Sequence, residues 1–255
     1  RNSLCRAQFA FAEKMKNVSV SESVFENCRV VSASPENPRG VLVWFHGGGW
    51  TVPLGEDSIA WGRELAAATG LAVYMPDYPL ARKFSCDEID AWSRAYWKNI
   101  YENCAGTGTP LFLGGDSAGA QIALSVLPAG TPKKAAFVYA VTTLVPEREH
   151  GSWTAYEKSW TLSPRLMEYF YKAYCPDTEK RRDHSPLEVL SEIPPTLLVT
   201  AADDVLADQQ TEFAKKFSAE QVVYAGAKHV FLSRPDGAEF RSRALRDIAA
   251  FFAKI

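Results

Sequence analysis

Apolar and polar positions alternate along the chain in two kinds of segment. After residue 28, short apolar runs rich in β-branched residues are separated by longer runs in which apolar residues recur three and four positions apart. The short runs predict strands at Cys28–Ser32, Val41–Phe45, Leu71–Met75, Leu111–Leu113, Ala136–Ala140, Thr196–Thr200 and Gln221–Tyr224. Strands that alternate with helices predict an α/β fold, with a mostly parallel central sheet flanked by helices.

The longer runs predict the helices. One helix is expected to be capped by Asp57, to continue through Ala68 and to end at Gly70, a residue suited to a left-handed C-cap. Other helices are predicted at residues 87–103, Ser117–Val126, Ser163–Tyr174 and Ala238–Ala253. Phe251 and Phe252 of the last helix are expected to dock on the sheet.

Residues 146–195 interrupt this alternation with a charged stretch and a helical segment crowded with aromatic residues. An insertion between one sheet strand and the next strand–helix unit is where such a fold can carry a lid. We therefore expect residues 1–255 to form a single domain with a small cap at about residues 146–195. Residues 1–27 are expected to be a short N-terminal segment that can contribute to the lid.

Composition excludes several classes of protein. The net charge of −2 gives no electrostatic case for nucleic-acid binding, and the longest apolar stretch, residues 135–145, is too short to span a bilayer. The 5 cysteines are widely spaced without a C-x-x-C or Cys/His ligand pattern, so no metal and no cofactor is predicted. Localisation stays open: a cytoplasmic location is slightly favoured, and a secreted one is compatible if a leader was removed.

Two glycine-framed motifs carry the candidate chemistry. Gly115-Asp116-Ser117-Ala118-Gly119 follows an apolar run and matches G-x-S-x-G, in which a serine sits on a sharp turn from strand to helix. His46-Gly47-Gly48-Gly49-Trp50 follows another apolar run and matches the HGGG-type loop, whose backbone N–H groups bind an oxyanion. Together, in this order, the two motifs predict an acyl-transfer hydrolase with Ser117 as nucleophile.

A serine nucleophile needs a histidine base, and in this fold the order along the chain is serine, acid, histidine. Of the 4 histidines, His46 precedes the serine, and its expected role is to hold the glycine loop. His150 and His184 lie in the presumed lid, before any aspartate at a strand end. Elimination therefore leaves His229 as the base.

The acid is expected just after the strand Thr196–Thr200, where three aspartates compete. Asp208 lies well into the following helix and is the weakest candidate. Asp203 and Asp204 are adjacent, and the residues alone do not separate them.

Beyond the two motifs, the chain resembles the hormone-sensitive-lipase-like group of α/β-hydrolases, the bacterial HGGG/GDSAG carboxylesterases, over about residues 38–255. Asp77-Tyr78-Pro79-Leu80-Ala81 resembles the D-Y-R-L-A segment of that group, with proline in place of arginine. Asp204-Val205-Leu206-Ala207-Asp208 resembles D-P-L-R-D, and residues 224–231 resemble Y-x-G-x-x-H-G-F, with Val230 in place of the glycine. This resemblance favours Asp204 as the acid.

The resemblance also implies the remaining roles. The oxyanion is expected to be bound by the backbone N–H of Ala118 and, by resemblance, by those of Gly48 and Gly49. The glycine loop arrives early in the chain, which suggests a shortened N-terminal lid and a shallow site. Trp50 and Trp160 are candidate pocket residues.

These features predict a serine carboxylesterase that hydrolyses small-molecule esters with acetyl to butyryl groups through an acyl-enzyme, with Ser117, Asp204 and His229 as catalytic residues. The alternative is an amide-cleaving serine hydrolase, such as an arylformamidase or a peptidase. A non-catalytic binding protein of the same fold is not favoured, because every position of the triad is filled.

Overall fold

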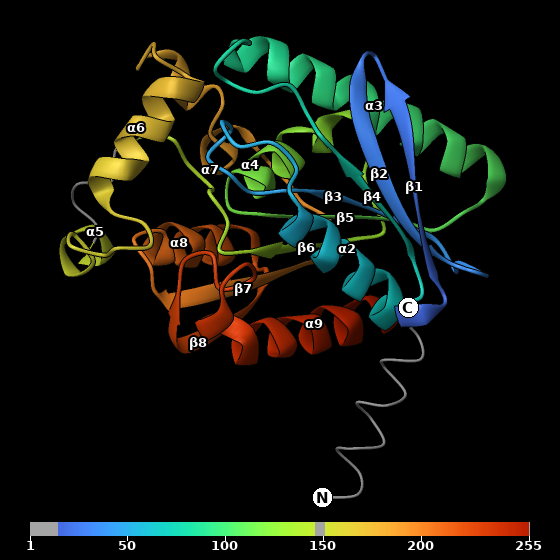
Figure 1. Cartoon of the computed structure of the whole chain (residues 1–255). Helices are drawn as coiled ribbons and strands as arrows, with labels where there is room; N and C mark the ends of the chain where they lie inside the picture. Colours follow the sequence, from blue (N-terminus) through green and yellow to red (C-terminus); the bar gives the residue numbers. More distant parts are fainter. Residues whose placement is uncertain (1–14, 146–150, 255) are drawn as a thin grey trace, which may run out of the picture.

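The computed structural model describes residues 15–145 and 151–254. Its strands are β1 (Val18–Phe25), β2 (Cys28–Pro35), β3 (Val41–Phe45), β4 (Ala72–Pro76), β5 (Leu111–Asp116), β6 (Lys134–Val138), β7 (Thr196–Asp203) and β8 (Glu220–Lys228). They form an 8-stranded sheet in the order β1-β2-β4-β3-β5-β6-β7-β8 (Figure 1). All neighbours from β4 to β8 are parallel, whereas β1–β2 and β2–β4 are antiparallel. The predicted α/β fold with a mostly parallel sheet is confirmed.

Helices cover both faces of this sheet. They are α2 (Glu56–Thr69), α3 (Cys86–Thr107), α4 (Ala118–Ser125), α5 (Gly151–Ala155), α6 (Pro164–Tyr174), α7 (Pro186–Val189), α8 (Ala207–Phe217) and α9 (Ala238–Ala253). Helices α2 and α9 pack on one face, and α3, α4 and α8 on the other (Figure 1). Successive residues of a strand point to opposite faces, so Leu42 and Trp44 of β3 enter the first layer while Val43 and Phe45 enter the second.

Strand β1 was not predicted. Val18–Phe25 pairs antiparallel with β2 at the edge of the sheet, and most of its side chains are exposed. A polar edge strand carries little of the apolar signal on which the sequence prediction depended. The described end of the segment 1–27 is therefore largely part of the sheet, whereas residues 1–14 lie outside the described residues.

Two helix starts also differ from expectation. Helix α2 begins at Glu56 with Gly55 as its N-cap, so Asp57 lies inside the helix and does not cap it; the predicted stop at Gly70 is found, at φ 70°. Helix α3 begins at Cys86, because Ser85 and Glu88 form a reciprocal capping box. Helix α9 has the predicted bounds, and its Phe252 ring packs 5.0 Å from Phe112 of β5.

The described part of the segment 146–195 contains α5, α6 and α7, and α5 and α6 stand at one end of the sheet (Figure 1). This end holds the carboxyl ends of the parallel strands, since Met167 and Phe170 of α6 border a cavity together with Ser117, directly after β5. In the described parts of the chain no helix is long and apolar enough to cross a membrane. The described cysteines, Cys28, Cys86, Cys104 and Cys175, are free.

Candidate active site

Ser117 occupies a sharp turn between β5 and α4. Its φ of 52° and ψ of −122° are unusual for a residue with a side chain, and such a conformation costs about 1–3 kcal/mol. Backbone hydrogen bonds hold the turn on both sides: Ser117 N donates to Val138 O at 3.0 Å, and Val141 N donates to Ser117 O at 3.1 Å. The end of β6 and the residues that follow it thus hold the serine at the carboxyl end of the sheet.

The glycines of the G-x-S-x-G motif allow the close backbone contacts that this turn requires. A Cβ atom at Gly119 would lie 2.2 Å from Phe45 O, and one at Gly115 would lie 2.7 Å from Gly119 O. Neither distance is compatible with a side chain, because the clashing atoms belong to the backbone. Helix α4 can therefore start directly against β3 only because both positions are glycine.

Ser117, His229 and Asp204 form a continuous chain of hydrogen bonds. Ser117 Oγ lies 2.9 Å from His229 Nε2, and His229 Nδ1 lies 2.6 Å from Asp204 Oδ2. All of these residues are buried, Asp204 at 1% exposure. The other carboxylate oxygen of Asp204 accepts a hydrogen bond from Leu206 N at 3.1 Å, which fixes the carboxylate in the orientation that meets the imidazole.

The other two aspartates contact the inserted segment instead. Asp203 Oδ1 accepts a hydrogen bond from the Tyr156 hydroxyl at 3.2 Å. Asp208 Oδ2 accepts one from Ser152 N at 2.8 Å. Of the three candidates, the one that the geometry brings to His229 is therefore Asp204.

His46 lies under the glycine loop. Its Nδ1 is 2.7 Å from Gly47 O, its ring stacks on Tyr78 at 4.4 Å, and the Tyr78 hydroxyl donates to His46 O at 2.9 Å. Burial lowers the pKa of His46 to about 4, so the ring is neutral at pH 7. Besides this stacking, two hydrogen bonds therefore join the loop to the D-Y-P-L-A segment: the one from the Tyr78 hydroxyl and one from Ala81 N to Trp50 O at 2.8 Å.

Asp116 joins the glycine loop to the serine turn. Its carboxyl group accepts hydrogen bonds from Trp44 Nε1 at 3.0 Å and from the backbone of Gly47. Burial raises the pKa of Asp116 to about 6 despite these hydrogen bonds. After Gly47, the loop takes positive φ angles at Gly48 (130°) and Gly49 (57°), conformations that glycine adopts without a steric penalty.

A cavity of about 140 Å³ opens beside Ser117 and His229. Gly48, Gly49 and Ala118 border it, as the predicted oxyanion-binding positions require. Its other walls are mainly apolar and come from four parts of the chain: Trp50, Val52, Val141, Thr161, Leu162, Leu166, Met167, Phe170 and Val230.

The two predicted pocket tryptophans lie in different places. Trp50 borders the cavity, yet its side chain is fully buried, donates to Gln121 Oε1 at 2.9 Å and stacks on Tyr174 at 4.6 Å. Trp160 is 64% exposed and does not border the cavity. Its ring is held outside by the Arg234 guanidinium, 3.8 Å from the ring centre. The expectation that Trp160 lines the pocket is therefore wrong.

Sequence reasoning gave no pocket role to Met167 and Leu162, although both border the cavity. For Met167 the signal available was the strong amphipathic pattern of residues 164–174, which marks a helix with one apolar face but does not say what that face covers; Leu162 precedes this helix. Val230, where the related group has glycine, also borders the cavity and has φ 56°. Such an angle is a strained conformation for a β-branched residue.

Comparison with known proteins identifies the family of the chain. The family model described as the alpha/beta hydrolase fold matches residues 42–233. An esterase of Gibberella moniliformis is 23% identical over 220 residues, which are 77% of this chain and 68% of the relative. An arylesterase of Saccharolobus solfataricus is 28% identical over 225 residues, which are 81% of this chain and 73% of the relative. The chain thus spans about two thirds of the length of the curated relatives it matches.

Solved structures show the same fold. Carboxyl esterase 2 from the fungus Tuber melanosporum has a TM-score of 0.85 at 22% identity, covering 93% of this chain and 87% of its own. A thermostable esterase from Pseudomonas putida has a TM-score of 0.81 at 23% identity, covering 96% and 88%. The resemblance drawn from the sequence is confirmed: the chain belongs to the α/β-hydrolase fold family and is a carboxylic ester hydrolase within it.

Proposed function

We propose that this chain is a serine carboxylesterase that cleaves esters of short acyl groups, acetyl to butyryl, through an acyl-enzyme intermediate. The observation that carries the proposal is the hydrogen-bonded chain from Ser117 through His229 to Asp204, at 2.9 and 2.6 Å, beside a small apolar cavity. A serine hydroxyl is a weak nucleophile until such a base takes its proton.

The reaction proceeds in two halves. His229 Nε2 takes the hydroxyl proton as Ser117 Oγ bonds to the ester carbonyl carbon, and the imidazolium then returns that proton to the departing alcohol oxygen. Water attacks the acyl-enzyme in the same way, with His229 as base, and releases the carboxylic acid and the free serine. Asp204 holds the imidazole with Nδ1–H pointing toward the carboxylate and stabilises the cation.

Negative charge develops on the carbonyl oxygen in each half of the reaction. We assign its stabilisation to the backbone N–H groups of Gly48, Gly49 and Ala118, all of which border the cavity that holds Ser117. The contacts of Asp116 support this assignment, since the same carboxyl group binds the glycine loop through Gly47 and sits directly before Ser117. Asp116 thereby holds the glycine loop, with Gly48 and Gly49, in a fixed position relative to the serine turn, with Ala118.

The size of the cavity supports the preference for short acyl groups. Its volume is about 140 Å³. A dry protein cavity of about 150 Å³ is enough for benzene, a six-carbon molecule. An acyl chain of four carbons therefore fits beside Ser117, whereas a chain of eight or more carbons must leave part of its length outside. The kcat/KM is expected to peak between acetyl and butyryl esters and to fall by octanoyl.

The nucleophile is tested first. A fluorophosphonate should modify Ser117 and no other serine, and Ser117→Ala should lose nearly all turnover of p-nitrophenyl butyrate while keeping its fold. Ser125→Ala is the matched control, because Ser125 is a buried serine at the end of α4, the helix that Ser117 precedes, and its hydroxyl donates to Ile122 O. Full activity of Ser117→Ala would refute the proposal.

The acid is tested by a pair of neighbouring variants. Asp204→Asn should lower kcat by about 10⁴-fold, since the amide favours the wrong imidazole tautomer. Asp203→Asn should change kcat little, because Asp203 contacts Tyr156 and not His229. The reverse ranking would show that the acid is misassigned. If formylkynurenine or a proline anilide were turned over faster than every ester tested, the proposed function would change from ester to amide hydrolysis.

A further inference from the structure

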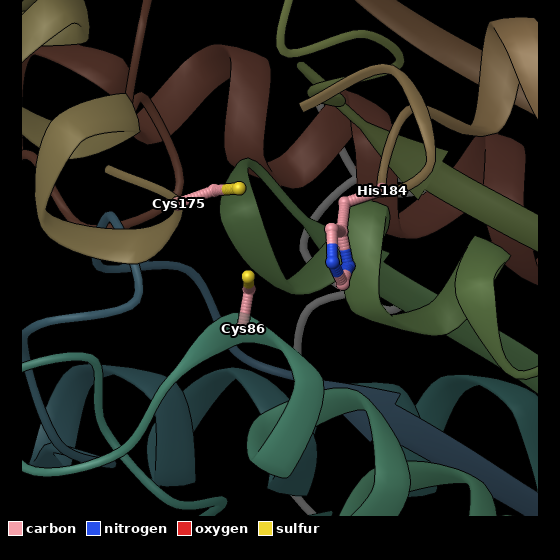
Figure 2. A group of neighbouring side chains, drawn as sticks. All are labelled: Cys86, Cys175 and His184. Carbon is pink, nitrogen blue, oxygen red and sulfur yellow. The ribbon is translucent and has the colours of Figure 1, made fainter. Parts of the chain in front are cut away.

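A second group of reactive side chains lies away from Ser117. Cys86, Cys175 and His184 are all buried, and their two sulfur atoms and a ring nitrogen lie within 4.8 Å of one another. Figure 2 shows the Cys86 sulfur atom pointing toward that of Cys175, with the imidazole of His184 beside them. The proposed hydrolytic mechanism uses none of these residues.

Each member comes from a different part of the chain. Cys86 is the first residue of α3, Cys175 is the residue that ends α6, and His184 lies just before α7. The backbone at Cys175 and at His184 is held by side chains outside the cluster. Arg181 Nε donates to Cys175 O at 3.0 Å, and Gln121 Nε2 donates to His184 O at 3.0 Å.

Two carboxylates surround the imidazole. His184 Nδ1 lies 2.8 Å from Asp90 Oδ2, which is buried, and Nε2 lies 3.2 Å from Asp87 Oδ1, which is exposed. A carboxylate on one ring nitrogen is the contact that orients histidine ligands in metal sites and leaves the other nitrogen for the ion. Asp87 is 61% exposed, and its other carboxylate oxygen accepts a hydrogen bond from Lys180 Nζ at 3.1 Å, so Asp87 must turn only its Oδ1 from Nε2 toward the ion to become a ligand.

We propose that Cys86 Sγ, Cys175 Sγ and His184 Nε2 bind one zinc-class divalent cation, with Asp87 within reach as a fourth ligand. Thiolate and imidazole ligands in tetrahedral arrangement select zinc over magnesium or calcium. Zinc binds thiolate sulfur at about 2.3 Å and imidazole nitrogen at about 2.0–2.1 Å, so ligand atoms around the ion lie somewhat under 4 Å apart. The spacing of 4.8 Å or less within this cluster requires only a small contraction.

An ion at this position would tie the inserted segment to the body of the fold. It would bridge the start of α3 to the end of α6 and to the approach to α7. Tyr174, next to Cys175, donates to Asp90 Oδ1 at 2.6 Å and stacks on Trp50. The proposed role is structural: the ion would hold α6 over the cavity, and the thiol protons displaced on binding would go to solvent.

The sequence did not reveal this group. Structural zinc sites are recognised by pairs of ligands a few residues apart, whereas these ligands are at positions 86, 175 and 184. The expectation that the chain binds no metal rested on that local spacing.

The test uses the full chain, stripped with a chelator and kept reduced, and cobalt(II) as the probe. A single cobalt ion per chain should bind with thiolate charge-transfer absorption and the intense visible bands of a tetrahedral ion. Zinc should abolish these bands and raise the unfolding temperature. The spectrum of the wild-type protein tests the proposal without any variant. The proposal would be overturned if cobalt did not bind, or if it bound without thiolate charge-transfer absorption.

Variants then locate the ligands. Cys86→Ser and Cys175→Ser should each lose most of the thiolate absorption. Cys104→Ser is the matched control, since Cys104 is another buried free cysteine of α3. Equal loss in the Cys104 variant would overturn the assignment. So would a Cys86–Cys175 disulfide that forms in air in the presence of zinc, detected by mass, because bound thiolates are protected from oxidation.

Discussion

The wall of the cavity formed by Phe170 controls the acyl length in our proposal. The Phe170 ring lies directly over the glycine loop: a Cβ atom added to Gly49 would be 2.3 Å from Phe170 Cδ1. Phe170 is only half-buried and borders the cavity, so truncating it opens space without removing a core residue. Phe170→Ala removes a benzene-sized ring from the wall of this cavity. The variant therefore enlarges the present 140 Å³ by the space that the ring occupies.

The gain can be expressed per carbon atom. Each methylene newly buried is worth about 0.8 kcal/mol. At 1.36 kcal/mol for each factor of ten, that is about fourfold in kcat/KM. Four additional carbons, from butyryl to octanoyl, give at most about 200-fold if all are buried. Because α6 covers only part of a longer acyl group, we expect the octanoate-to-butyrate ratio of kcat/KM to rise about 10- to 200-fold in Phe170→Ala.

The assay compares p-nitrophenyl butyrate with p-nitrophenyl octanoate for wild type and two variants. Tyr169→Ala is the control, because Tyr169 is next to Phe170 on the same helix, is 53% exposed and does not border the cavity. Its octanoate-to-butyrate ratio should equal that of the wild type. An unchanged ratio in Phe170→Ala, or an equal rise in Tyr169→Ala, would refute the argument from cavity size.

Three further predictions concern the loops around the site. Val230→Gly should raise the free energy of unfolding, measured in urea, by about 1 kcal/mol. Val230 has a strained φ of 56°, and relief of this strain, worth about 1–3 kcal/mol, exceeds the entropic cost of glycine. A lower free energy of unfolding would show that the valine is not strained. Gly49→Ala should lower kcat/KM by about 10²-fold or more, through displacement of an oxyanion donor by the Phe170 ring. Adding Phe170→Ala to this variant should restore part of the activity, and no recovery would exclude that clash as the cause. The last of the three predictions uses an Asp116→Asn background, because the raised pKa of that carboxyl has an opposite effect on the free energy of unfolding. In this background the free energy of unfolding should fall as the pH drops from about 6.5 to about 4. Buried His46, whose pKa is about 4, stays neutral in the folded protein over this range, whereas the same imidazole takes up a proton in the unfolded chain. The slope should approach about 1.4 kcal/mol per pH unit and should shrink when His46→Gln is added; an unchanged slope would contradict it.

The serine turn and the glycine loop could be found from the sequence because their geometry depends on short stretches of chain. Gly115 and Gly119 are required by contacts within the turn itself and with the adjacent β3. The requirement therefore produces a short motif of neighbouring residues that can be recognised in the sequence. The choice between Asp203 and Asp204 was different. Adjacent residues near a strand end point in opposite directions, and β7 has an irregularity between Ala201 and Asp203 that shifts the register. The resemblance to a family, not periodicity, made that choice.

The pocket walls could not be derived in the same way. Trp160 and Phe170 are both aromatic residues of the inserted segment, and nothing in their spacing distinguishes them. Their positions are decided by distant partners. Arg234 and Lys228, from the region of β8, attract the Trp160 ring outward, whereas Phe170 packs on Gly49. Such contacts join residues separated by more than fifty positions, and a local pattern carries no information about them.

Trp50 shows how these long-range contacts bear on chemistry. Its φ of 57° continues the left-handed turn of Gly49, and its ring is anchored on α4 through Gln121 and on the end of α6 through Tyr174. Trp50 therefore borders the cavity as predicted, but one face of its indole ring is covered by Tyr174. Because of the same contacts, we expect a shift of α6 also to move the loop that carries the proposed oxyanion donors. In our proposal, acyl preference and oxyanion geometry are therefore coupled through Trp50, and substitution of Tyr174, which holds the indole ring from α6, should change kcat as well as KM.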